Sequence, residues 1–98
     1  MGDTLQQSAG DGTAIAVVTG ATGAIGSATA GRLVAEGWQV ALVGRDRDRG
    51  QALAAELGPR AVSFVADAVS SAAVDAAFAR IVERLGPPRA LVHAVGST

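Results

Sequence analysis

A six-residue apolar run passes directly into three spaced glycines in AIAVVTGATGAIG, residues 14–26. Because the apolar residues are continuous rather than alternating, the run predicts a strand that is covered on both faces, as in a parallel sheet. The glycines open an amphipathic segment that ends at Glu36 and Gly37, where Gly37 can supply the residue that closes a helix. The stretch therefore predicts a strand, a glycine turn and a helix in immediate succession.

The spacing of Gly20, Gly23 and Gly26 suits a phosphate group. Gly20 permits a tight turn, Gly23 lets the backbone approach a pyrophosphate, and Gly26 lets the helix pack closely on the strand. The N–H groups and the positive end of the helix dipole would then face the anion. An ordinary strand-to-helix turn is the alternative, since a glycine triplet by itself is weak evidence for a ligand.

The rest of the chain continues the alternation of strand and helix. The expected elements are a strand at 38–43, a helix at 47–57, a strand at 61–65, a helix that begins near Ser70 or Ser71, and a strand at 90–95. This order predicts an α/β fold with a Rossmann-like parallel sheet, the N-terminal βαβαβαβ half of a doubly wound domain. The last strand is expected to leave an open edge.

Composition limits the classes of function. The 98 residues are 49% hydrophobic and 17% charged with a net charge of −1, which fits one small domain and gives no basic excess for binding nucleic acid or an anionic membrane. Residues 1–13 are too polar to offset the entropy of ordering, so we expect a disordered leader there and the domain over 14–98. Without a membrane span or a signal-peptide pattern, a cytoplasmic protein is expected. Zero cysteines and one histidine predict no metal site.

From the glycine loop onward, the chain resembles the short-chain dehydrogenase/reductase family, and the resemblance runs from about Ala14 to the C-terminus. The family's classical loop is TGxxxGxG, and an extended branch uses TGxxGxxG. This chain has Ala24 at the classical middle glycine, so its loop fits the extended branch, while the charge pattern after the second strand looks classical. The resemblance implies the N-terminal Rossmann portion of an oxidoreductase that transfers hydride between a nicotinamide cofactor and a carbonyl or alcohol substrate.

The resemblance also implies a choice of cofactor. Gly44 stands where NAD-preferring relatives carry an acid, and Arg45 stands where NADP-preferring relatives carry a basic residue. Because a guanidinium can pair with a 2′-phosphate, NADP(H) is the preferred cofactor and NAD(H) the second choice. A solvated turn, in which Asp46 and Asp48 offset the arginines, is the alternative.

Two residues after the third strand match the family's adenine contacts. The carboxylate of Asp67 would accept from the adenine amino group, and the backbone N–H of Ala68 would serve the ring; a turn or helix cap is the alternative for Asp67. Three hydroxyls lie in or beside the loop, those of Thr19, Thr22 and Ser27. They would donate to phosphate; the alternative is that these residues are there because serine and threonine are common where helices begin. The cofactor-binding residues expected overall are Thr19, Gly20, Thr22, Gly23, Ala24, Ile25, Gly26, Arg45, Asp67, Ala68, Ala94 and Gly96.

The segment LVHAVG, residues 91–96, resembles the family's LVNNAG segment beneath the cofactor. It departs from that pattern at positions 93–95, which leaves Gly96 as the clearest match. His93 is the single histidine of the chain, and we favour a packed, hydrogen-bonded histidine over a proton-transfer group.

No catalytic residue is expected in this chain. Hydride transfer in the family uses a serine and a YxxxK pair beyond the fourth strand, and the chain contains neither tyrosine nor lysine. The substrate, and any homo-oligomer, would therefore belong to a longer protein of which this chain is the N-terminal part. A stand-alone nucleotide-binding or regulatory module is the alternative. Another Rossmann protein, such as a methyltransferase, fits less well because Gly44 and Arg45 lack the acid that usually holds an adenosine ribose.

Overall fold

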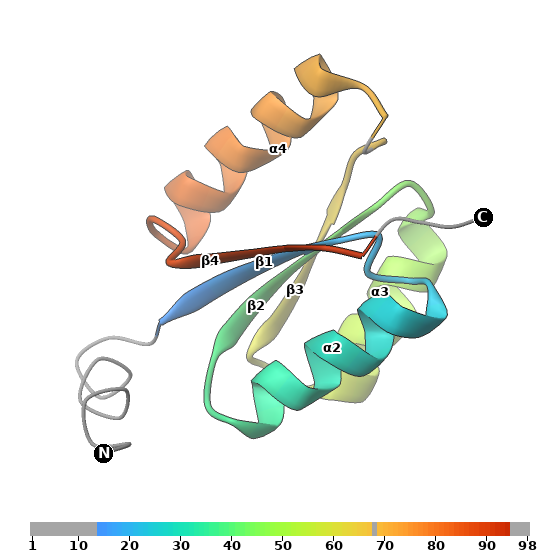
Figure 1. Ribbon diagram of the computed structural model, residues 1–98, viewed down its shortest axis with the longest axis vertical. Helices are drawn as coiled ribbons and strands as arrows, with labels where there is room; N and C mark the ends of the chain where they lie inside the picture. Colours follow the sequence, from blue (N-terminus) through green and yellow to red (C-terminus); the bar gives the residue numbers. More distant parts are fainter. Residues whose placement is uncertain (1–13, 68, 95–98) are drawn as a thin grey trace.

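The computed structural model describes residues 14–67 and 69–94 (Figure 1). The elements are β1 (Ile15–Thr19), α2 (Ala24–Ala35), β2 (Gln39–Gly44), α3 (Arg47–Leu57), β3 (Ala61–Val65), α4 (Ser71–Arg84) and β4 (Ala90–His93). The predicted α/β alternation is confirmed, and α3 and β3 have the predicted ends. The leader expected at residues 1–13 lies outside the described residues.

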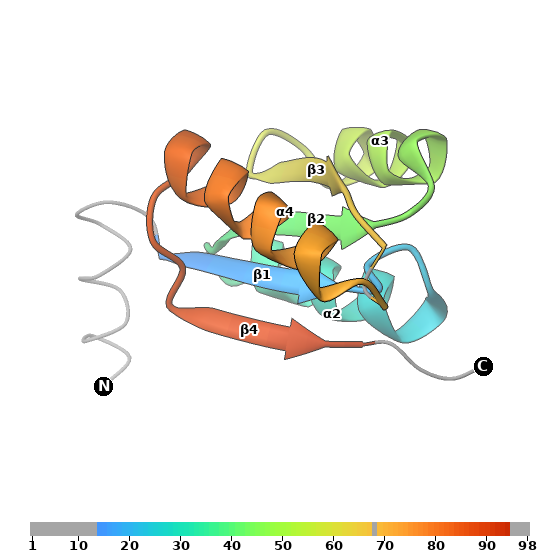
Figure 2. The same ribbon diagram turned by 90° about the horizontal axis from the view of Figure 1, so that it is seen from above.

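All strand pairs in the sheet are parallel, and the strand order is β3-β2-β1-β4. Helices α2 and α3 cover one face of the sheet, and α4 covers the other (Figures 1 and 2). Strand β4 lies on the opposite side of β1 from β2, so the strand order switches direction at β1. In open α/β sheets, ligands bind beyond the carboxyl ends of the strands at such a switch point. The glycine loop follows β1 and therefore lies there.

Each face of the sheet has its own apolar core. On the α4 side the buried residues are Val17, Ala41, Val43, Phe64, Ala66, Ala77 and Ile81. On the α2 and α3 side they are Val18, Ala21, Ala30, Val40, Leu42 and Ala61. Strand β1 is buried along its whole length, as its continuous apolar run predicts. The core thus fixes the strand from which the glycine loop departs.

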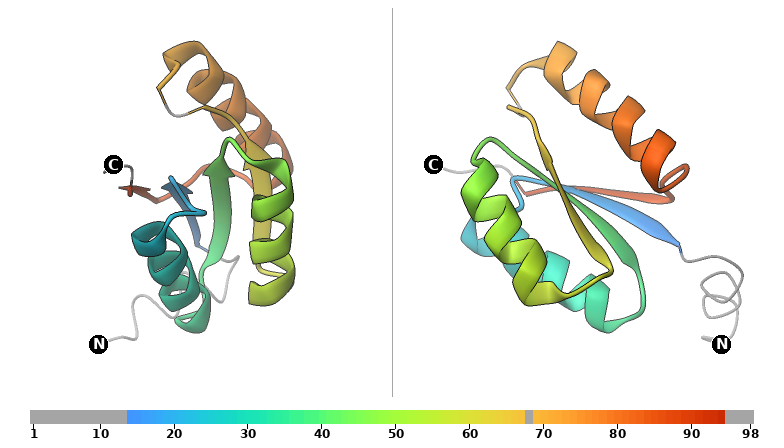
Figure 3. Two further views of the ribbon diagram at one scale, coloured as in Figure 1. Left: turned by 90° about the vertical axis from the view of Figure 1, so that its right-hand side faces the viewer. Right: turned by 180° about the vertical axis from the view of Figure 1, so that it is seen from behind.

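The last described strand, β4, forms one outer edge of the sheet. Within the described residues β4 pairs only with β1, so the open edge expected from the sequence is confirmed for them, and Leu91 on this strand is 50% exposed. The other outer edge is β3, which lies between α3 and α4 (Figure 3). Within residues 14–67 and 69–94, no helix has both the length and the apolar character needed to cross a bilayer.

Candidate functional site

The loop after β1 makes a tight turn that leads into α2 and is hydrogen-bonded to the end of β2. Gly20 has a φ of 71°, a conformation that glycine adopts without strain. The N–H groups of Gly20 and Ala21 both donate to the Val43 carbonyl, at 2.9 and 3.2 Å. Gly23 then donates its N–H to the Gly20 carbonyl at 3.2 Å, which closes the turn. These bonds place the start of α2 directly above the end of β1.

The second and third glycines of the loop differ in how closely the chain packs around them. A Cβ atom at Gly26 would collide with the Gly20 carbonyl oxygen and would lie 2.9 Å from the Cα of Ala21. A Cβ atom at Gly23 would meet only the Gly20 carbonyl oxygen, at an ordinary 3.6 Å. Packing within the described chain therefore demands glycine at position 26 and does not demand it at position 23.

Helix α2 begins without a side-chain cap. Gly23 is its N-cap residue, and the first intrahelical bond runs from the Ser27 N–H to the Gly23 carbonyl at 2.9 Å. Among the described residues, the N–H groups of Ala24, Ile25 and Gly26 have no hydrogen-bond acceptor. Free N–H groups at the positive end of a helix form a binding site for an anion.

The three hydroxyls near the loop differ in their partners. The Ser27 hydroxyl donates to the Ala24 carbonyl at 3.2 Å. The Thr19 side chain is fully buried, and its hydroxyl lies 2.7 Å from Nδ1 of His93. Within the described part of the chain, the Thr22 hydroxyl has no hydrogen-bond partner, and it lies beside Gly44 at the end of β2. Thr22 is therefore the hydroxyl best placed to donate to a ligand.

The contact between Thr19 and His93 ties β1 to β4. The two residues are direct partners in the parallel register, and the Thr19 hydroxyl also lies 3.4 Å from the Val92 carbonyl. The expected hydrogen bond of His93 is thus confirmed, but the expected packing is wrong, because His93 is exposed on the edge strand. The sequence did not indicate this pair, since its members are 74 residues apart.

Arg45 follows the end of β2 and is exposed. No hydrogen bond or ion pair of its side chain is found in the described residues. The neighbouring Asp46 caps α3 instead, because its Oδ1 accepts from the Arg49 N–H at 3.0 Å and its Oδ2 lies 4.0 Å from the Arg49 Nε. The Asp46 carboxylate is therefore engaged by the start of α3 and by Arg49 rather than by Arg45.

Asp67 lies just beyond the end of β3. Its Oδ1 accepts from the Val69 N–H at 3.0 Å, and its carbonyl accepts from the Ser70 N–H at 3.0 Å, so the turn-capping alternative is present. The second carboxylate oxygen has no partner within the described residues. Ala94 donates its N–H to the Thr19 carbonyl at 3.0 Å. The expected contacts Ala68 and Gly96 lie outside the described residues.

These residues gather at one edge of the sheet. The glycine loop, Arg45, Asp67 and Ala94 follow β1, β2, β3 and β4 respectively, and parallel strands end on the same side (Figure 2). Free N–H groups, a guanidinium and a carboxylate oxygen thus lie along one edge of the sheet. In the described ranges, no group of three or more His, Cys, Asp or Glu side chains could hold a metal ion.

Comparison with known proteins connects this site to one family. Residues 14–98 match the family model described as short chain dehydrogenase. Serine 3-dehydrogenase of Agrobacterium fabrum is 39% identical over 80 residues, which are 82% of this chain and 32% of that protein.

Solved structures of two reductases superpose closely on this chain. A variant of actinorhodin polyketide ketoreductase with NADPH superposes with a TM-score of 0.81 and 35% identity, over 87% of this chain and 34% of that one. The 3-ketoacyl-(acyl-carrier-protein) reductase of Brucella melitensis, complexed with NADH, gives a TM-score of 0.77 and 31% identity, over 82% of this chain and 33% of that one. The chain thus spans about a third of the length of these proteins.

Proposed function

The chain belongs to the short-chain dehydrogenase family, a family of oxidoreductases, and from this premise we propose that it is the NADP(H)-binding portion of such an enzyme. The reaction we assign to the whole enzyme is hydride transfer between the nicotinamide and a small carbonyl or alcohol substrate. In that reaction the bound nicotinamide supplies or accepts the hydride, and the protein holds the cofactor in place.

The observation that carries the proposal is the uncapped start of α2. The N–H groups of Ala24, Ile25 and Gly26 have no acceptor among the described residues. Gly20 allows the preceding loop to bond to β2, and Gly26 allows α2 to pack closely on that loop. A cofactor diphosphate would accept from these groups and would interact favourably with the helix dipole. The Thr22 hydroxyl would add one further donor from the same loop.

The preference for NADP(H) rests on Arg45. The exposed guanidinium stands at the end of β2 without an intramolecular partner in the described residues, and the nearest carboxylate in sequence, Asp46, is engaged at the start of α3. Arg45 is therefore available for charge-assisted hydrogen bonds to a 2′-phosphate. The free oxygen of Asp67 is the acceptor that we assign to the adenine amino group.

The chain contributes binding and orientation rather than proton transfer. It contains no tyrosine and no lysine, so the acid and base side chains of the family's YxxxK pair cannot come from it. His93 does not replace them in our assignment, because its Nδ1 is engaged by Thr19. The residues that exchange a proton with the substrate would come from sequence outside these 98 residues.

Calorimetric titration of the 98-residue chain with NADPH tests the proposal. We expect binding, and we expect Gly23→Ala to weaken it tenfold or more, about 1.4 kcal/mol, because a methyl group would keep the diphosphate away from the backbone. The Gly23→Ala chain should stay folded and lose no more than about 1 kcal/mol in the free energy of unfolding, the usual cost of alanine at an N-cap, since its Cβ meets nothing closer than 3.6 Å. Gly31→Ala in the middle of α2 is the matched control and should leave the NADPH affinity unchanged. Equal affinities of the parent chain and Gly23→Ala would contradict the proposal.

A further inference from the structure

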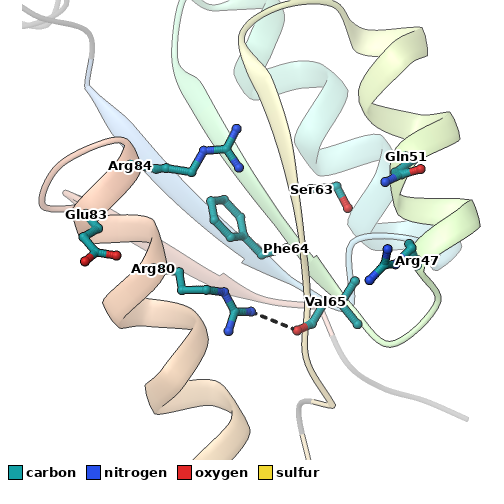
Figure 4. A pocket seen from close by; sticks show the side chains of 8 residues that line it. All are labelled: Arg47, Gln51, Ser63, Phe64, Val65, Arg80, Glu83 and Arg84. Carbon is teal, nitrogen blue, oxygen red and sulfur yellow. Dashed lines mark hydrogen bonds between the residues drawn. The ribbon is translucent and has the colours of Figure 1, made fainter.

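A second site lies along the outer edge of β3, two strands away from β1. A groove of about 570 Å³ lies between α3 and α4 beside this edge (Figure 4). Its lining includes three arginines, Arg47 from α3 and Arg80 and Arg84 from α4, and one carboxylate, Glu83. None of these four residues belongs to the cofactor contacts proposed above.

The main chain of β3 is open on the groove side. The Val40 N–H donates to the Arg60 carbonyl, and the Ala66 N–H donates to the Gly44 carbonyl, so the even-numbered residues of this stretch face β2. The N–H and carbonyl groups of Ser63 and Val65 consequently point away from the sheet. Within the described residues, the Val65 carbonyl alone among these groups has a partner.

That partner is Arg80, whose guanidinium donates to the Val65 carbonyl at 3.2 Å (Figure 4). A guanidinium has five N–H groups, so Arg80 keeps donors for a second acceptor in the groove. The neighbouring Arg84 lies with its guanidinium 5.7 Å from the centre of the Phe64 ring, a contact that favours one position of the charge. Both arginines are thus held beside the open strand edge.

The spacing of the arginines matches an extended chain. Arg80 and Arg84 are four residues apart on α4, which corresponds to ~6 Å along a helix. Alternate side chains on one face of a strand repeat at about 6.6 Å. On the other side of the sheet plane, Arg47 and Gln51 are also four residues apart on α3. A strand added to the edge of β3 would turn every second side chain toward α4 and the others toward α3.

We propose that the edge of β3 binds an acidic, extended segment of a partner protein as an additional strand. Alternate carboxylates of the segment would pair with Arg80 and Arg84, and the carboxylate between them would pair with Arg47. The main chain of the segment would bond to the outward N–H and carbonyl groups of Ser63 and the N–H of Val65. Strand addition of this kind takes affinity from the main chain and specificity from the side chains.

Fluorescence anisotropy of fluorescein-labelled hexaglutamate, titrated with the 98-residue chain at low salt, tests this proposal. We expect saturable binding that weakens tenfold or more in the double variant Arg80→Gln, Arg84→Gln. Arg89→Gln makes the same kind of charge change next to the opposite edge strand, β4, and should stay within twofold of the parent. Because all three arginines are exposed, circular dichroism should show that each variant remains folded.

A second probe separates strand addition from simple charge attraction. Hexaglutamate that is N-methylated at every residue keeps every carboxylate and loses the main-chain N–H donors of both strand edges, and we expect it to bind at least tenfold more weakly. The proposal is overturned if the two peptides bind equally, if Arg89→Gln weakens binding as much as the double variant, or if hexaglutamate does not bind. Gly23→Ala should leave peptide binding unchanged, so the outcome is independent of NADPH binding.

Discussion

Three helices of this chain begin at the same edge of the sheet, and one of them begins differently from the other two. Asp46 caps α3 by accepting from the Arg49 N–H, and Ser70 caps α4 by accepting from the Ala73 N–H. Helix α2 begins at Gly23, which has no side chain to offer. Each of the two caps accepts a hydrogen bond from an N–H group of its own helix start, whereas the N–H groups of Ala24, Ile25 and Gly26 at the start of α2 have no acceptor among the described residues.

The glycines around α2 show the same division between stability and binding. Gly26 is fixed by the close approach of α2 to the loop, whereas a Cβ atom at Gly23 would make only an ordinary contact of 3.6 Å with the Gly20 carbonyl oxygen. A substitution at Gly26 should therefore change the stability of the fold, whereas a substitution at Gly23 should change the affinity for the proposed ligand.

The largest expected effect is that of Gly26→Ala. The added methyl group would collide with the Gly20 carbonyl oxygen, and the backbone around it would have to move. We expect a loss of about 3 kcal/mol or more in the free energy of unfolding, at or beyond the upper end of common overpacking effects. Urea denaturation measures this loss. Gly31→Ala is the control, because its Cβ would meet only a Leu57 methyl at 3.6 Å, and it should be neutral or stabilising. Similar stabilities of the two variants would contradict the packing argument.

Arg45→Ala is expected to have the next largest effect, on binding rather than on folding. Losing a charge-assisted hydrogen bond to the 2′-phosphate should weaken the binding of NADPH by roughly 1.5–3 kcal/mol, about 10- to 150-fold. NADH has no 2′-phosphate, so its affinity should change little. Parallel titrations of the variant with the two cofactors measure the difference. Equal losses would remove the assignment of Arg45 to the 2′-phosphate.

Substitutions at the caps of α3 and α4 should have a smaller effect, on the stability of the fold rather than on NADPH binding. Ser70→Ala removes the hydroxyl that accepts from the Ala73 N–H and should lower the unfolding free energy by about 1 kcal/mol. Asp46→Ala should do the same at α3. Ser70→Ala should leave NADPH binding unchanged. The contrast among the helix starts fails if both variants are as stable as the parent.

The smallest effect is expected for Thr19→Val. The change removes a buried hydroxyl whose partner, His93, can turn to solvent, so the stability loss should be at most about 1 kcal/mol. NADPH affinity should stay within twofold of the parent, because the structure directs this hydroxyl to β4 rather than to the loop. A tenfold loss of NADPH affinity would instead indicate that the Thr19 hydroxyl contacts the phosphate.

The sequence predicts the order and type of the described elements because a local signal marks each of them, although β2 (Gln39–Gly44) and β4 (Ala90–His93) differ by one or two residues from the expected 38–43 and 90–95. Helix α3 runs from Arg47 to Leu57, as expected, and Gly37 follows α2 with a φ of 98°, as the residue that closes a helix. The continuous apolar run of β1 predicts a strand covered on both faces, which is how β1 lies in the sheet.

Parts of the site could not be predicted in the same way, because they depend on residues far apart in the chain. The Thr19 hydroxyl bonds to His93 only because β1 and β4 are neighbours in that register. The exposure of His93 follows from the position of β4 at the edge of the sheet; the sequence predicts that edge but not which of its side chains stay exposed. The groove beside β3 requires α3 and α4 to lie on opposite faces of the sheet, with the edge strand between them.

The proposed cofactor site depends on the free N–H groups at the start of α2, and nuclear magnetic resonance can observe these groups directly. In the 15N-labelled 98-residue chain, NADP+ should produce its largest amide shifts at Ala24, Ile25 and Gly26, while the amides of Arg49 and Ala73, engaged by the caps of α3 and α4, should move much less. Unchanged signals of residues 24–26 at millimolar NADP+ would contradict the claim that this helix start holds the cofactor diphosphate.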